Sequence, residues 1–204
     1  MASRTYRIVV MGGSFNPPTL AHYRLMLCAA EAVGAEKGLF VPAKQSYVQK
    51  KIRRLKHKRE VLAEETRLAM LKAMCEGDRR LDADGCEYGM NDGAHTYEML
   101  EAIQKKYPDA ELWFLTGGDK LSVISRWHRS RELLERFRIL AVARGDALPE
   151  KAIAENPFLQ KYAASFRTFQ IPGDLEAVSS SQVRDLLRDG DESAAQMVHP
   201  AAVG

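Results

Sequence analysis

The chain of 204 residues has few cysteines, no long apolar run and a small net charge. Its three cysteines, Cys28, Cys75 and Cys86, form no Cys-x-x-Cys pair, so neither a zinc site nor a disulfide framework is predicted. No apolar run approaches the roughly 20 residues of a membrane-spanning helix, and the N-terminus lacks the apolar core of a signal peptide. These absences favour a cytoplasmic protein without a membrane partner.

The overall charge also argues against a general binder of polyanions. Lys and Arg number 30 against 27 Asp and Glu, a net charge of +3 that is too small to attract nucleic acid by itself. Hydrophobic residues make up 46% and charged residues 28%, which is ordinary for a globular protein. We expect one domain over residues 1–204, with a frayed or loosely docked tail after about 193, and no nucleic-acid partner.

Apolar runs alternate with segments of helical spacing along the chain. The pattern predicts strands near 5–11, 38–42, 110–115, 137–143 and 166–171, and helices near 19–33, 58–76, 95–106, 119–125, 129–135 and 181–188. Strands that alternate with helices are typical of an α/β fold, with a mainly parallel sheet covered by helices on both faces.

Residues suited to chemistry follow the ends of the predicted strands. Four such loops cover residues 12–22, 42–51, 116–119 and 144–146. In open parallel sheets, ligands bind beyond the carboxyl ends of the strands, at the point where the strand order reverses. The four loops are therefore expected to outline one crevice.

The most informative loop runs Gly-Gly-Ser-Phe-Asn-Pro-Pro-Thr-Leu-Ala-His from Gly12 to His22. Glycines let the backbone approach an anion closely, and a helix N-terminus offers unpaired N–H groups and a positive dipole end. His22 falls in the first helical turn, within reach of a phosphate oxygen. A tight turn without a ligand would account for the glycine pair alone, but the length of the whole string favours a phosphate site.

A second motif, Ser179-Ser180-Ser181-Gln182-Val183-Arg184, precedes the last predicted helix. The serines are suited to cap that helix, which by itself needs no ligand. Arg184 would oppose the helix dipole by about 0.3–1 kcal/mol in the first turn. A bound anion would remove this conflict, whereas pairing of Arg184 with Asp185 or Asp189 is the alternative. The pattern favours anion binding.

These two motifs together resemble the paired signatures of the nucleotidylyltransferase superfamily. The likeness is greatest to nicotinate or nicotinamide mononucleotide adenylyltransferases and extends from about residue 6 to residue 190. Between the motifs, Gly117-Gly118-Asp119 and Trp127 are similar to the family's Gly-x-Asp and Trp, and Thr96-Tyr97-Glu98-Met99-Leu100 is similar to its Thr-Tyr-x-x-Leu segment.

The resemblance implies a Rossmann-like, doubly wound fold and transfer of AMP from ATP to nicotinate or nicotinamide mononucleotide, with release of pyrophosphate, in NAD biosynthesis. It implies catalytic roles for His22, Thr19 and Arg184. It implies ATP-binding roles for Gly13, Ser14, Phe15, His22, Ser180, Ser181 and Arg184, and mononucleotide-binding roles for Lys44, Thr96, Tyr97, Asp119 and Trp127. Mg²⁺ is expected to arrive with ATP, bound by phosphate oxygens and water rather than by protein ligands.

Two positions depart from the family's His/Thr-x-Gly-His signature. The first is Thr19, an accepted variant, and the third is Ala21 in place of Gly. The Ala21 methyl group could crowd a nucleotide that lies on this backbone. This departure bears on the fit of ATP more than on the type of reaction.

Two other functions remain open at this point. One is a related transferase that uses phosphopantetheine, or CTP with a phospho-alcohol; the other is a non-catalytic nucleotide- or RNA-binding module. The segment 117–127 favours a pyridine mononucleotide, and the pairing of His22 with Arg184 favours retained catalysis. The choice between nicotinate and nicotinamide stays open, as does the oligomeric state, for which a homo-oligomer is compatible with the sequence.

The segment 50–59 carries seven Lys or Arg residues in ten. A solvated surface is the simplest interpretation, a loop that gathers phosphate over the active site is the second, and a patch for nucleic acid or an acidic partner is the third. If the segment gathers substrate, neutralising Lys50 and Lys51 should raise the KM for the mononucleotide. His57, His128 and His199 are expected at the surface. For His95, which adjoins Thr96, a surface position is favoured over contact with substrate.

Overall fold

The computed structural model describes residues 5–53, 60–92, 95–143, 148–171 and 197. The predicted helix at 181–188, the loop at 144–146 and the tail apart from Met197 lie outside these residues. Within the described part, no helix is long and apolar enough to cross a membrane.

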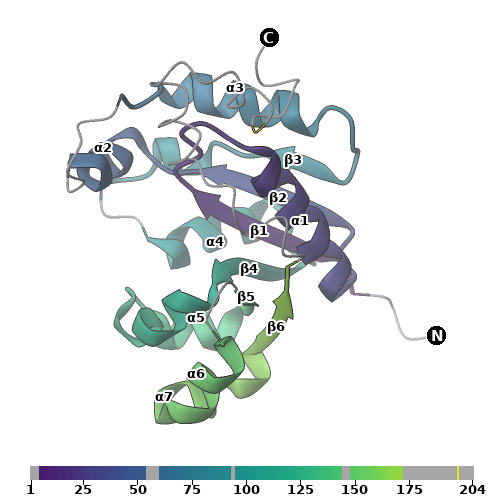
Figure 1. Cartoon of the computed structure of the whole chain (residues 1–204), viewed down its shortest axis with the longest axis vertical. Helices are drawn as coiled ribbons and strands as arrows, with labels where there is room; N and C mark the ends of the chain where they lie inside the picture. The colour runs from purple at the N-terminus through teal and green to yellow at the C-terminus, as the bar shows by residue number, and fades with distance from the viewer. Residues whose placement is uncertain (1–4, 54–59, 93–94, 144–147, 172–196, 198–204) are drawn as a thin grey trace.

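A six-stranded parallel sheet with the order β3-β2-β1-β4-β5-β6 forms the centre of the fold (Figure 1). The strands are β1 (Arg7–Gly13), β2 (Lys37–Pro42), β3 (Leu81–Ala83), β4 (Glu111–Gly117), β5 (Arg138–Ala143) and β6 (Phe166–Gln170). The order reverses between β1 and β4, so the two halves of the sheet meet there. The Rossmann-like, doubly wound fold predicted from the sequence is confirmed.

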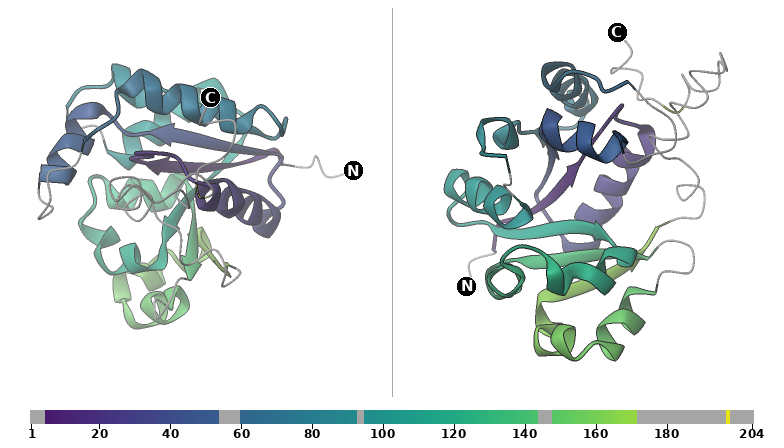
Figure 2. Two further views of the ribbon diagram at one scale, coloured as in Figure 1. Left: turned by 45° about the horizontal axis from the view of Figure 1, so that its top comes forward. Right: turned by 90° about the vertical axis from the view of Figure 1, so that its left-hand side faces the viewer.

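Helices cover both faces of the sheet, as Figure 2 shows. The α-helices are α1 (Leu20–Val33), α2 (Gln45–Arg53), α3 (Glu64–Cys75), α4 (Thr96–Lys106), α5 (Ser130–Arg136), α6 (Pro149–Glu155) and α7 (Pro157–Lys161), and the 3₁₀ helices are η1 (Cys86–Gly89), η2 (Gly118–Arg126) and η3 (Ala163–Ser165). Helices α1 and α3 pack on one face, and α4, α5 and α7 pack on the other. In Figure 1, α6 and α7 lie at the opposite end of the molecule from α3.

Strand β1 shows why the central strands read as continuous apolar runs. Ile8 and Val10 point into the core on the α4 side, whereas Val9 and Met11 point into the core on the α1 side. Because both faces are covered, neither set of side chains meets water, and Ile8, Val9 and Val10 are 0% exposed. The burial of both faces places β1 at the middle of the molecule, with its carboxyl end at the point where the strand order reverses.

Several elements differ from the sequence-based expectation. Helix α3 begins at Glu64 instead of residue 58, and the segment 42–51, expected as a loop, contains most of α2. The short strand β3 and the helices α6 and α7 were not predicted. Helix α2 has only two buried residues, Val48 and Ile52, so its apolar periodicity is too weak to detect in a segment rich in Lys and Gln.

Candidate functional site

Helix α1 begins directly after the first motif, and His22 takes part in its N-terminal cap. Thr19 is the N-cap residue; its N–H donates to His22 Nδ1 at 3.0 Å, and its Oγ1 lies 2.7 Å from the same nitrogen. The His22 N–H is 3.4 Å from Thr19 Oγ1, which completes a reciprocal capping box. Since Nδ1 accepts a hydrogen bond, the proton of the neutral ring belongs on Nε2. The Nε2–H is thus the donor that His22 offers to a phosphate oxygen.

The cap also accounts for Thr19, which the sequence placed among the phosphate contacts. Thr19 is 0% exposed, and its hydroxyl is engaged with His22. In this structure its side chain holds the imidazole in place at the start of the helix. A direct phosphate contact of Thr19 stays a prediction.

The backbone between β1 and α1 turns tightly around the Phe15 ring. Phe15 has a φ of +42° and is 2% exposed, and its ring lies 5.0 Å from the His22 ring in an edge-to-face arrangement. A Cβ atom on Gly13 would lie 3.0 Å from the Phe15 ring, so any larger residue would have to shift the ring from its present packing. Because the Phe15 side chain is in the core, Phe15 can serve the predicted ATP site only through its main chain.

Two buried polar side chains connect this turn to α3 and to the residues just before it. The Asn16 amide donates to the Glu60 carbonyl at 3.0 Å and accepts from the Leu62 N–H at 2.9 Å. The guanidinium of Arg67 donates to the Ser14 carbonyl at 2.9 Å. Asn16 is 1% exposed and Arg67 is 0% exposed. The turn that carries the first motif is therefore held from behind by polar groups that do not reach solvent.

Two cations considered in the sequence have different partners here: Lys44, directly before α2, and Lys51, within α2. Lys51 Nζ lies 3.4 Å from the hydroxyl oxygen of Ser14. Lys44 Nζ donates to the Met90 carbonyl at 2.6 Å and lies 3.2 Å from an Asp92 carboxylate oxygen. The Ser46 hydroxyl and the Lys44 ammonium hold the pKa of the Asp92 carboxyl below its usual value. Lys51 thus adjoins the turn between β1 and α1, which is called the phosphate-type turn below. Lys44 instead contacts Met90 and Asp92, in the segment that leads to α4.

The Gly-Gly-Asp segment continues the adjacent strand β4. A Cβ on Gly117 would come within 2.4 Å of Asp119 Oδ1, so a larger residue there would displace the Asp119 carboxylate from its present position. Asp119 is exposed and pairs with Lys120 at 2.7 Å. Trp127 follows η2, and its half-buried ring meets Phe114 of β4 edge to face at 6.1 Å. Both predicted residues therefore follow the strand that borders β1.

The Thr-Tyr segment begins helix α4, but its two residues have different surroundings. Thr96 is half-buried at the first helical position. Tyr97 is 1% exposed; its hydroxyl donates to Glu101 at 3.1 Å, and the Arg129 guanidinium lies 3.8 Å from its ring centre. The Tyr97 ring is a packing element of the core, so a contact with the mononucleotide would need its main chain.

Sequence reasoning did not detect a small cluster beside Thr96 and Trp127. The His95 and His128 rings are 5.1 Å apart. Glu98 accepts from the main-chain N–H of His95 at 3.0 Å and lies 3.2 Å from the ring nitrogen Nε2 of His128. Both histidines are exposed, as a surface role predicts, although their pairing through Glu98 was visible only in the structure.

A family profile described as cytidylyltransferase-like matches residues 10–186. The matched region includes the turn, His22, the β4 loop and the serine motif. The chain belongs to the cytidylyltransferase-like family. Ser180, Ser181 and Arg184 lie outside the described residues, so their convergence with His22 stays a prediction.

Curated relatives narrow the position of the chain within the cytidylyltransferase-like family. A protein of Carboxydothermus hydrogenoformans, named "Probable nicotinate-nucleotide adenylyltransferase", is 30% identical over 90% of this chain and 87% of its own length. A protein of Lachnoclostridium phytofermentans with the same name is 27% identical over 90% of this chain and 88% of its own length. The chain is a member of the nicotinate-nucleotide adenylyltransferase group of this family.

Solved structures of the same group share the fold. The nicotinic acid mononucleotide adenylyltransferase of Plasmodium falciparum complexed with NaAD superposes with a TM-score of 0.71, over 97% of this chain and 93% of that chain, at 17% identity. The same enzyme complexed with APC gives a TM-score of 0.72 and covers 92% of that chain. At this identity the likeness establishes the architecture around the cytidylyltransferase-like motifs, not the roles of individual residues.

The residues around the turn also bear on where a metal ion could be held. In the part of the chain that the structure describes, no three His, Cys, Asp or Glu side chains are grouped so that they could hold a metal ion. The side chains of His22 and Lys51 lie beside the turn and are suited to phosphate oxygens, whereas the buried Arg67 donates to the Ser14 carbonyl behind it. A magnesium ion at this place would therefore rely on phosphate and water oxygens, which Mg²⁺ accepts readily.

Sequence reasoning did not single out Arg67. The buried residues of α3 are Arg67, Leu71, Met74 and Cys75. A charged residue four positions before a core leucine was the available signal, because an arginine on a buried helical face needs a specific polar partner.

Proposed function

We propose that the protein transfers AMP from ATP to nicotinate mononucleotide. A phosphate oxygen of the mononucleotide attacks the α-phosphorus of ATP, the bond from this phosphorus to the β-phosphate bridging oxygen breaks, and pyrophosphate leaves. No covalent enzyme intermediate is needed, so positioning and electrostatic stabilisation supply most of the acceleration. The product is the dinucleotide precursor of NAD.

The observation that carries the type of reaction is the placement of His22. Its Nδ1 is engaged by Thr19, so Nε2–H is directed by the helix cap at the start of α1. This cap follows the carboxyl end of β1, beside the point where the strand order reverses. A donor at a helix N-terminus stabilises negative charge that builds on a phosphate.

Support for the acceptor comes from the relatives and from the β4 side of the sheet. The curated relatives are named for nicotinate nucleotide, and a structural neighbour is complexed with NaAD. Asp119 lies at the start of η2, directly after β4, and Trp127 follows η2; a ribose and a pyridine ring would lie there, across the switch point from the phosphate turn. We assign Trp127 to the pyridine ring, Asp119 to the ribose and pyridine side, and Lys44, Thr96 and the Tyr97 main chain to the mononucleotide.

The triphosphate of ATP is proposed to meet the chain at both ends of the sequence. Gly13, Ser14, the Phe15 main chain and His22 would contact it from the first turn. Ser180, Ser181 and Arg184 of the serine motif would hold the β- and γ-phosphates. Mg²⁺ enters bound to the phosphates of ATP, where it neutralises charge on them.

The test is acceptor profiling with the purified protein. ATP and Mg²⁺ are supplied with nicotinate mononucleotide, nicotinamide mononucleotide or phosphopantetheine in turn, and pyrophosphate release is measured; CTP replaces ATP in a parallel set. We expect release with nicotinate mononucleotide and ATP at a kcat/KM at least 10-fold above the other pairs. Absence of release with either pyridine mononucleotide contradicts the proposal.

A further inference from the structure

The guanidinium of Arg67 lies behind the phosphate-type turn without access to solvent. Arg67 is 0% exposed and heads the fully buried side chains of the described residues by volume. It donates to the carbonyl oxygens of Ser14 at 2.9 Å and Leu62 at 3.2 Å, and to Gln45 Oε1 at 3.4 Å. Burial of a charge is costly unless its hydrogen bonds are well made. An arginine that occupies such a place while donating to neutral acceptors needs an explanation other than core packing.

The contact with Ser14 fixes the direction of a peptide group in the turn. The Ser14 carbonyl and the Phe15 N–H belong to one planar peptide, and in a trans peptide the two point in opposite directions. Since Arg67 holds the carbonyl on the α3 side, the Phe15 N–H faces away from α3. Donation by a cation to the carbonyl also polarises the peptide and strengthens its N–H as a donor. Arg67 thereby orients and activates one main-chain donor of the turn.

The backbone conformation at Phe15 requires stabilisation by surrounding contacts. Its φ of +42° lies in the left-handed region, which a bulky side chain adopts only when its surroundings impose it. The ring is anchored against His22 and Phe40, at 5.0 and 5.7 Å between ring centres. The ring contacts fix one side of the residue, and the Arg67 hydrogen bond fixes the peptide that precedes it. Phe15 and His22 are therefore positioned as one unit.

Arg67 also links helix α2 to the same turn. Its contact with Gln45 reaches the first residue of α2, and the Gln45 N–H donates to the Glu64 carboxylate at the start of α3. The Ala43 N–H donates to the Gly13 carbonyl at 2.8 Å. These bonds hold the basic helix against the turn, so that Lys51 reaches Ser14.

We propose that Arg67 is a positioning residue for nucleotidyl transfer: it holds the Ser14–Phe15 peptide so that the Phe15 N–H faces the phosphate group reached by His22. This role rests on the proposed function. Arg67 does not touch substrate; it acts through the turn. The planar fork is essential, because one guanidinium serves the Ser14, Leu62 and Gln45 acceptors at once, which a lysine ammonium on a single stem cannot do.

The kinetic test compares Arg67→Lys and Arg67→Ala with the wild type. We expect Arg67→Lys to lower kcat about 10- to 100-fold with KM values for both substrates changed less than about 3-fold, because small misplacement of donors is felt most in the transition state. Arg67→Ala should lower kcat further than Arg67→Lys does. Guanidinium chloride at a non-denaturing concentration should raise the kcat of Arg67→Ala at least 10-fold. Ammonium chloride at the same ionic strength should restore none.

Tyr88→Phe is the matched control. Tyr88 packs its ring 5.8 Å from the Arg67 guanidinium and donates its hydroxyl to the Glu64 carbonyl at 2.8 Å. Tyr88→Phe therefore removes a hydrogen bond in the same cluster but spares the Ser14 carbonyl. We expect a lower Tm, a kcat within 2-fold of the wild type and no activation by guanidinium. If guanidinium activates this variant or the wild type equally, or if Arg67→Lys keeps full kcat, the proposal is overturned.

Amide hydrogen exchange tests the role of Arg67 without relying on enzyme activity, so it separates this inference from the proposed function. It is measured on Arg67→Lys and therefore applies even if Arg67→Ala does not fold. In Arg67→Lys, main-chain amides of residues 13–16 should exchange at least 10-fold faster than in the wild type, with amides of β5 unchanged. Unchanged exchange in the turn overturns the proposal even if the enzyme is active. Faster exchange in a protein that releases no pyrophosphate from any acceptor supports the hold on the turn and contradicts the proposed function alone.

Discussion

At the scale of single residues, His22 combines a structural and a chemical task in one ring. Nδ1 accepts from the N–H of Thr19, which is 0% exposed, so the imidazole satisfies a buried donor. Nε2 is then left with the proton, which is the state that a phosphate oxygen requires. Loss of the imidazole ring should therefore lower both the stability of the protein and its turnover. A substitution that keeps the hydrogen bond to Thr19 but lacks the imidazole distinguishes the two effects.

We predict that His22→Ala and His22→Gln both lower kcat at least 100-fold, because neither supplies an imidazole Nε2–H to the phosphate. His22→Ala should also lose about 1–2 kcal/mol of unfolding free energy, since the Thr19 N–H loses its acceptor. Glutamine at this third helical position can accept from the cap N–H, so His22→Gln should keep most of the stability. Steady-state pyrophosphate release and urea unfolding measure both. Near-normal turnover in His22→Gln would remove His22 from the mechanism.

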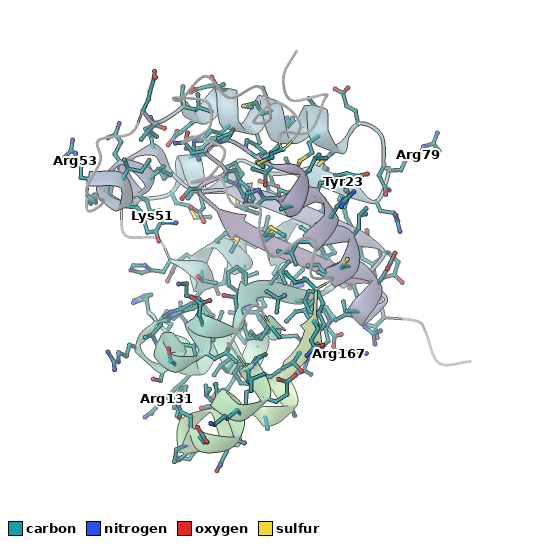
Figure 3. All side chains as sticks on the ribbon, viewed as in Figure 1. Tyr23, Lys51, Arg53, Arg79, Arg131 and Arg167 are labelled. Carbon is teal, nitrogen blue, oxygen red and sulfur yellow. The ribbon has the colours of Figure 1, made fainter. Side chains whose placement is uncertain are left out.

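At the scale of elements, α2 explains part of the basic segment that the sequence left with three interpretations. Val48 and Ile52 pack with Ala43, which fixes the rotation of the helix about its axis. With that rotation, Lys51 reaches Ser14, whereas Arg53 extends away from the body of the molecule in Figure 3. Among the described cations of the run, Lys51 thus lies at the site and Arg53 is directed toward solvent.

Lys51→Met should raise the KM for the mononucleotide about 5- to 20-fold with a smaller change in kcat, because a cation that gathers phosphate acts in the ground state as well as in the transition state. Arg53→Met removes the same charge from the exposed side and should leave KM within 2-fold. The difference between the variants should shrink at high salt, since screening weakens the attraction. Equal KM values for the two variants at low salt would favour a solvated surface for the whole run.

At the scale of the whole molecule, two ionisable side chains near the site, Glu87 and Arg67, have pKa values that burial shifts. Burial raises the pKa of the Glu87 carboxyl to about 7, although the Lys44 N–H and the Arg67 charge both lower it. Burial likewise lowers the pKa of Arg67 from its ordinary value, while Tyr88, Glu64 and Glu87 raise it. Arg67 bonds to the turn at Ser14 and its charge acts on Glu87, so the stability of the fold and the shape of the turn depend on neighbouring groups.

The Glu87 carboxyl predicts a pH dependence of unfolding. Its pKa is about 7 in the folded protein and near 4.5 when exposed, so the folded state binds the proton more tightly. The stabilisation from the protonated group is complete below about pH 4.5 and is lost as the pH rises through about 7. Glu87→Gln, which stays neutral, should become more stable relative to the wild type between pH 5 and pH 8, by up to about 3 kcal/mol.

Urea unfolding at both pH values measures this effect. Glu76→Gln, which removes an exposed carboxylate at the end of α3, is the control and should show little change between the two pH values. A Glu87→Gln variant whose advantage over the wild type is the same at pH 5 and pH 8 would contradict a buried, proton-binding Glu87.

The alternation of strands and helices, the phosphate-type turn and the family were all determined by the sequence alone. Each rests on local order in the chain: the apolar run of β1, the string from Gly12 to His22 and the start of α4 are contiguous segments whose patterns need no partner. The apolar periodicity of the sequence did not predict elements that are stabilised mainly by tertiary packing. Helix α2, with two buried residues, and the three-residue strand β3 are examples.

Only the tertiary structure decided which polar groups serve the site and which serve the core. Tyr97 and Arg67 both carry polar groups, yet both are buried, because each forms a hydrogen bond with a distant segment: Tyr97 with Arg136 and Arg67 with Ser14. Arg67 meets Ser14 across 53 positions of sequence, a distance that no local pattern encodes. A chain specifies its turns and strands through neighbouring residues, whereas the partner of a buried charge is set by the way the sheet order brings remote segments together.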